Sequence, residues 1–142
     1  MVAPLDRLDD TAWVDLQRDD VFREIRRAGF TAVRIAIDFT TAQRQSHDRS
    51  GAFHPLWLAR IERIARNADR SGLATILAAR APADLTDTAS QARLTADWRK
   101  LAQHLRGARD TVMFELLDHP DDTLADEAWS ALAEQLRMAI RA

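Results

Sequence analysis

The spacing of apolar residues switches repeatedly between two periods along this chain, and that switching limits the fold more than any other feature. Four segments carry apolar residues every three or four positions, the period of a helix with one buried face: 19–28, 55–71, 91–106 and 128–141. Three short apolar runs lie between them, at 30–39, 73–79 and 111–117. Strands that alternate with helices predict right-handed β–α–β units on a parallel sheet, so the predicted fold class is α/β.

The connections support this order. Gly29 and Gly72 follow helical segments, and Gly29 stands where a helix usually ends in a residue with positive φ. Pro55 suits a first helical turn. The polar, turn-rich residues 40–53 predict a long loop, and residues 1–18 show little pattern. We therefore expect three parallel strands and four helices in one domain that occupies residues 1–142.

Length and charge exclude several classes of protein. The chain has 142 residues, 20 Lys and Arg against 22 Asp and Glu, a net charge of -2 and no cysteine. Its basic residues are scattered, which argues against nucleic acid or an anionic membrane as a partner. No apolar stretch is long enough to span a bilayer, the N-terminus lacks the apolar core of a signal peptide, and no glycine-rich phosphate loop is present. We expect no cofactor.

Three parallel strands leave two sheet edges without partners, which a stable monomer has to cover. The chain is therefore expected to be part of a larger unit. One form of that unit is a homodimer in which the exposed edges of two sheets pair and rebuild a closed, barrel-like sheet.

Polar residues mark the carboxyl ends of the strands, where ligands bind in parallel sheets. Asp38, Arg80 and the pair Asp118-His119 stand there. Arg34 lies in mid-strand opposite the apolar row, and Glu115 interrupts the third strand in the same way. Because buried charges are tolerated when paired, we predict an ion pair between Arg34 and Glu115 on the concave face of the sheet, with His119 on the same face.

Three stretches carry a resemblance to a known family. They are "FREIRRAGFTAVRI" at 22–35, "FHPLWLARIERIARNADRSGLATIL" at 53–77 and "WRKLAQHLRGARDTVMFELLDHP" at 98–120. Together with the last helix they resemble the front half of glycoside hydrolase family 5, the cellulase-like (β/α)8 barrels. The family motifs V-R-I-P and F-E-L-L-N-E-P are recognisable in them, and a histidine pair on the strand between is absent. The resemblance implies that the three predicted strands are barrel strands two, three and four.

The resemblance also implies roles for single residues. Arg34 matches the arginine that supports the nucleophile, and Arg80 and Ala81 stand at the places of the two substrate-binding histidines. Asp118 replaces the asparagine that orients the sugar, and His119 replaces the glutamate that is the general acid/base. The nucleophilic glutamate belongs to strand seven, which lies beyond these 142 residues. Asp118 precedes the acid/base position by one residue, so its side chain is expected to start toward the other face of the sheet.

A retaining glycosidase needs two carboxyl groups about 5–5.5 Å apart. We therefore expect a truncated relative of β-glucan hydrolases without catalysis of its own, or alternatively an oligosaccharide-binding or dimerising module. Family members are commonly secreted, and this sequence leaves localisation open. A metal site built from His47, Asp48, His54, His119, Asp121 and Asp122 matches no known spacing, and we expect none. Of the four Trp, Trp98 and Trp129 are expected in the core, Trp57 beside its helix stripe, and Trp13 is open.

Overall fold

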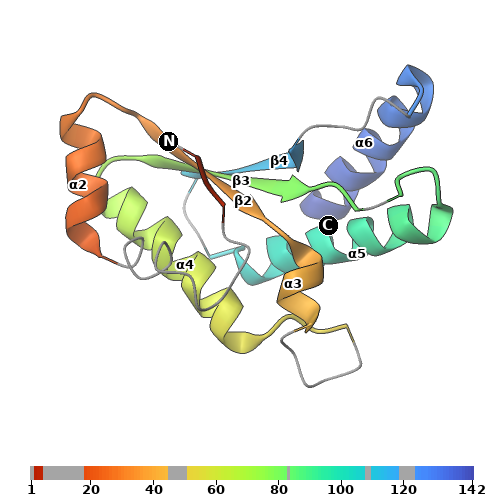
Figure 1. Cartoon of the computed structure of the whole chain (residues 1–142), viewed down its shortest axis with the longest axis horizontal. Helices are drawn as coiled ribbons and strands as arrows, with labels where there is room; N and C mark the ends of the chain where they lie inside the picture. The colour runs from red at the N-terminus through yellow and green to blue at the C-terminus, as the bar shows by residue number, and fades with distance from the viewer. Residues whose placement is uncertain (1, 5–17, 45–50, 83, 108–109, 119–123) are drawn as a thin grey trace.

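The structure is a computed structural model, and it describes residues 2–4, 18–44, 51–82, 84–107, 110–118 and 124–142. Its strands form one parallel sheet in the order β1 (Val2–Pro4), β2 (Ala32–Ile37), β3 (Ala74–Arg80) and β4 (Val112–Asp118). The described helices are α2 (Asp19–Arg27), α3 (Phe39–Arg44), α4 (Pro55–Arg70), α5 (Thr88–His104) and α6 (Asp126–Arg141). Figure 1 shows the sheet with α4 and α5 running along one of its faces. The predicted α/β class is confirmed, and the three predicted strands and four predicted helices are all present.

Two elements were not predicted. β1 lies in the segment that showed little pattern, and it pairs with β2 over three residues, too few to show a period. α3 occupies part of the segment expected to be loop, so that expectation was wrong at its start. Asp38 begins this short helix by accepting a hydrogen bond from the amide of Thr40 at 2.8 Å. The described part of the chain therefore contains four successive strand–helix units rather than three.

The core lies between the sheet and the helices. Val33, Ile35 and Ile37 project from β2 and keep no more than 2% of their surface exposed. They belong to one cluster with Trp57 and Ile61 of α4, which are also buried. Each such side chain contributes about 1.5–3 kcal/mol through its removal from water. Trp57 is thus a core residue rather than one beside the stripe, while the predicted core position of Trp98 is confirmed.

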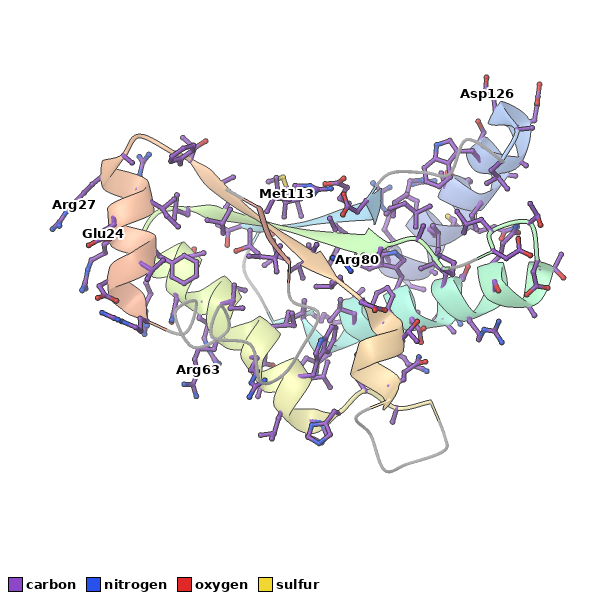
Figure 2. All side chains as sticks on the ribbon, viewed as in Figure 1. Glu24, Arg27, Arg63, Arg80, Met113 and Asp126 are labelled. Carbon is purple, nitrogen blue, oxygen red and sulfur yellow. The ribbon has the colours of Figure 1, made fainter. Side chains whose placement is uncertain are left out.

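The opposite face of the sheet is the open one. The register aligns Arg34, Ile76 and Met113 across β2, β3 and β4, and strand residues at aligned positions share a face. Met113 keeps 46% of its surface exposed and projects away from α4 in Figure 2. Among the described helices, none lies over this face (Figure 1).

Every described helix is too short or too polar to cross a lipid bilayer.

Glycine fixes two of the helix-to-strand turns. Gly29 and Gly72 have φ values of 94° and 73°, a region that residues with a Cβ rarely adopt. They let the chain reverse directly after α2 and α4 and enter β2 and β3. These turns set the parallel register, which brings the carboxyl ends of the strands together at one edge of the sheet.

Candidate functional site

Three charged side chains from two non-adjacent strands meet on the open face. Arg34 of β2 donates from Nε to Glu115 Oε2 at 2.7 Å and from Nη2 to Glu115 Oε1 at 2.6 Å. Its Nη2 also donates to Asp118 Oδ1 at 2.6 Å. The predicted ion pair between Arg34 and Glu115 is therefore present, in bidentate geometry, and Asp118 joins it. We call these three residues the arginine clamp.

The small side chain of Ala78 gives Arg34 room to reach β4. β3 separates β2 from β4, and Ala78 pairs with Ala36 on one side and with Glu115 on the other. Neighbouring strands lie about 4.8 Å apart, so the guanidinium has to cross roughly 10 Å to bond a carboxylate two strands away. A larger residue at position 78 would stand in that path. Sequence reasoning missed this role, although "AAR" at the end of β3 carried its signal.

β4 is irregular at the clamp, and this corrects the expectation for Asp118. Ala78 pairs with Glu115 whereas Arg80 pairs with Asp118, so β4 uses one residue more than β3 over the same span. An extra residue shifts the alternation of side chains by one position. Asp118 therefore lies on the same face as Glu115. Strict alternation placed it on the opposite face, and that prediction was wrong.

Trp98 of α5 supports the irregular end of β4. Its indole Nε1 donates to the carbonyl of Leu116 at 3.1 Å. The Trp98 ring also meets Phe114 edge to face at 5.4 Å between centroids, and Phe39 at 5.3 Å. Such contacts add about 0.5–1.5 kcal/mol beyond burial. Trp98 is thus the core residue that holds the strand carrying both carboxylates.

The clamp is half-shielded from water. The side chains of Arg34, Glu115 and Asp118 are 25%, 36% and 15% exposed. The hydrogen bonds that Arg34 donates to Glu115, and then the one that it donates to Asp118, raise the pKa of the Arg34 guanidinium above its already high ordinary value. One permanent cation thus holds two carboxylates. Such a group can accept hydrogen bonds from the hydroxyl groups of a ligand through the remaining carboxylate lone pairs.

A polar pocket of about 350 Å³ lies beside the carboxyl ends of β2 and β3. It is lined by residues of those ends and of α3 and α5, among them Asp38, Gln43, Arg80, Arg93 and Asp97. Arg80, predicted to bind substrate, is exposed and lines this pocket. Pockets at the carboxyl ends of strands are the usual ligand sites of parallel sheets.

Asp97 is a polar residue of this pocket that sequence reasoning missed. It is only 6% exposed, and its Oδ1 accepts from Gln43 Nε2 at 2.8 Å and lies 3.4 Å from Lys100 Nζ. Burial raises the pKa of its carboxyl group, and the nearby Lys100 opposes that rise. The sequence does contain an indication of this role. Asp97 stands next to Trp98 on the apolar face of a helix, where a carboxylate needs a polar partner.

His119 lies outside the described residues, so its predicted place on the concave face stays a prediction. The same holds for His47, Asp48, Asp121, Asp122 and Trp13 of the earlier hypotheses. His54 caps α4, because its Nδ1 accepts from the amide of Leu56 at 3.2 Å. Within the described ranges, no three His, Asp or Glu side chains gather in a way that could hold a metal ion.

Comparison with known proteins was made for sequence and for structure. The model of the cellulase family, glycosyl hydrolase family 5, matches residues 6–142. No curated protein matches the sequence. Among solved structures, endoglucanase Cel5A from the hyperthermophilic Thermotoga maritima is similar with 26% identity and a TM-score of 0.76.

That similarity covers 87% of this chain but 40% of the endoglucanase. A structure of the Thermotoga maritima enzyme in complex with cellobiose gives 27% identity and a TM-score of 0.75 over the same shares. A family 5 enzyme from Prevotella bryantii has the same fold, with 22% identity, a TM-score of 0.72, and coverage of 87% of this chain and 41% of that one. The chain thus spans about 40% of the length of the solved relatives.

Proposed function

Because the chain belongs to glycosyl hydrolase family 5, we propose that it forms the front half of a β-glucan cleft and does not hydrolyse glycosidic bonds by itself. The observation that carries this proposal is the arginine clamp. In it, the two carboxylates near the end of β4 share the guanidinium of Arg34 through hydrogen bonds of 2.6–2.7 Å. Both carboxylates are thus arranged as supports for the Arg34 guanidinium.

The chemistry of the family supports the absence of catalysis. Retaining hydrolysis needs one carboxylate free to attack the anomeric carbon and a second carboxyl group that delivers a proton. By the resemblance, the acid/base position holds His119 and the nucleophile position has no counterpart among the 142 residues. Glu115 and Asp118 come from one strand and bond the same cation. This shared partner supports a role for both carboxylates in holding Arg34 rather than in attack on a sugar.

The test is release of reducing sugar from soluble β-glucan. We expect none above the buffer rate for the 142-residue chain, and the same result for His119→Ala and Glu115→Gln. Hydrolysis that is abolished by His119→Ala would contradict the proposal. Circular dichroism of each variant establishes that it is folded, so that a lack of activity is not a lack of structure.

Binding of oligosaccharides without hydrolysis is the second candidate. The polar pocket beside β2 and β3 favours it, because Asp38, Arg80 and Asp97 can accept from and donate to sugar hydroxyl groups. Endoglucanase structures similar to this chain contain cellobiose or mannotriose. Calorimetry with cello-oligosaccharides at millimolar concentration should give heat that Arg80→Ala reduces. Arg63→Ala is the matched control, since Arg63 is exposed on α4 and points away from the sheet (Figure 2). An absence of heat would exclude this candidate.

A further inference from the structure

The outer edge of β4 is incompletely covered compared with the interior strands. On the helix side of β2 and β3, Ile35 and Leu77 are no more than 1% exposed. The aligned Phe114 of β4 and its neighbour Leu116 are only half-buried. A groove of about 610 Å³ runs between β4 and α6, lined by Phe114, Leu116, Trp129 and Ile140 and by polar residues of α6. This edge presents both backbone groups and apolar side chains to a further strand.

The number and direction of the strands indicate what fits there. The described sheet contains four parallel strands in sequential order, each followed by a helix, with β1 and β4 at its two edges. A closed barrel of the (β/α)8 type has eight strands of this kind. Two copies related by a twofold axis bring β4 of each copy beside β1 of the other, with the parallel direction kept. Both open edges of both copies are then paired, and no other element is required.

The charges of the open face allow two copies to face one another. Arg34 and Arg80 balance Glu115 and Asp118, so these four side chains together carry no net charge. Net charge of -2 per chain adds little repulsion. Met113, which is 46% exposed, would be covered because the open face becomes the interior of the barrel. The site would then contain two arginine clamps, one from each copy.

We propose that the surface formed by the β4 edge, the groove beside α6 and the open face binds a second copy of this chain, so that two half-barrels close into one barrel. The partner's β1 pairs with β4, and the partner's clamp faces Arg34 across the interior. The cleft is therefore incomplete without the second copy. This inference does not depend on whether the cleft binds a sugar.

Cross-linking tests the pairing directly, because the chain has no cysteine of its own. Val2→Cys and Met113→Cys place one thiol on each of the two edge strands of the sheet, β1 and β4. Mixing the two single-cysteine proteins with a short bismaleimide should yield a cross-linked dimer, whereas each protein alone should yield little. Cross-linking of Met113→Cys with itself would show that two β4 edges pair, and would overturn the proposed arrangement.

Sedimentation equilibrium tests the dimer itself at concentrations up to about 100 μM, where even micromolar affinity populates the complex. We expect a dimer for the 142-residue chain. For Met113→Lys we expect the dissociation constant of the dimer to rise about tenfold or more, since a charge would enter the interior. Met138→Lys is the matched control, because Met138 is 58% exposed on α6 and lines a different depression with Thr95 and Arg99 of α5. A folded chain that stays monomeric would overturn the proposal. So would a monomer that is captured only by a polypeptide carrying the remaining strands of a family 5 barrel.

Discussion

Replacing Arg34 with methionine should reveal how strongly the arginine clamp holds the sheet together. Methionine keeps the apolar stem of the side chain and removes the guanidinium. Glu115 and Asp118 then face each other without the cation that bonds both of them at 2.6–2.7 Å. We expect a loss in the free energy of unfolding, with the fold retained because the apolar face of the sheet is unchanged.

The exposure of the side chains sets the size of that loss. Breaking a fully buried ion pair costs about 3–5 kcal/mol, whereas an exposed pair contributes about 0.2–1 kcal/mol. Arg34, Glu115 and Asp118 are 25%, 36% and 15% exposed, which places the clamp between these limits. We therefore expect Arg34→Met to lower the free energy of unfolding by about 2 kcal/mol.

Urea denaturation followed by circular dichroism measures this loss, and double-mutant cycles divide it between the partners. Glu115 receives two of the hydrogen bonds and Asp118 one. The coupling of Arg34→Met with Glu115→Gln should thus be about 1–1.5 kcal/mol, larger than its coupling with Asp118→Asn. Arg63→Met serves as the control for loss of an exposed arginine. Coupling below roughly 0.3 kcal/mol in both cycles would refute the clamp as a stabilising contact.

Three further substitutions test other parts of the structure. Burial raises the pKa of Asp97, so the folded state binds a proton on this carboxyl group more tightly than the unfolded chain does. At neutral pH the buried, ionised carboxylate therefore lowers the free energy of unfolding. That loss shrinks as the pH falls through the raised pKa. Asp97→Asn should therefore raise the free energy of unfolding at neutral pH and reduce its decline from acidic to neutral pH, measured by thermal melts across that range. Thr75→Val should stabilise the fold by about 1 kcal/mol in urea denaturation, since the buried Thr75 hydroxyl has no hydrogen-bond partner among the described residues. Gly72→Ala should cost about 1–2 kcal/mol because φ is 73° there, while Gly107→Ala, with no positive φ and open space around it, should change the melting temperature little.

The sequence predicted the long elements because their periods are unambiguous. α4 and α5 have 16 and 17 residues, and over such lengths an apolar stripe is easily distinguished from chance. β1, with three residues, is below the length at which alternation can be seen. It is defined by its pairing with β2, a long-range contact that a local pattern does not contain. α3 was hidden for a similar reason, since its six residues are mostly polar and its start depends on the cap from Asp38.

The candidate site was predictable to the same extent. Arg34 and Glu115 could be paired in advance, because two opposite charges on apolar strands have few ways to be satisfied. Asp97 and Ala78 could be noticed in the sequence as unusual positions, but their roles depend on which residues face them from other elements. The function of His119 rests on the resemblance alone, as this residue lies outside the described part of the chain.

The misplacement of Asp118 has a physical explanation that bears on the function. Side chains alternate between the two faces of a strand only while its register with the neighbouring strand is regular. Between Glu115 and Asp118, β4 has one residue more than the paired segment of β3. An added residue costs a backbone pairing, so it persists where other contacts compensate. Here the indole of Trp98 bonds the carbonyl of Leu116, and Arg34 bonds Asp118. The irregularity therefore turns a second carboxylate toward the open face beside Glu115, at the end of the sheet where a parallel fold binds its ligands. Alternation along β4 therefore fails at the position where Arg34, Glu115 and Asp118 meet.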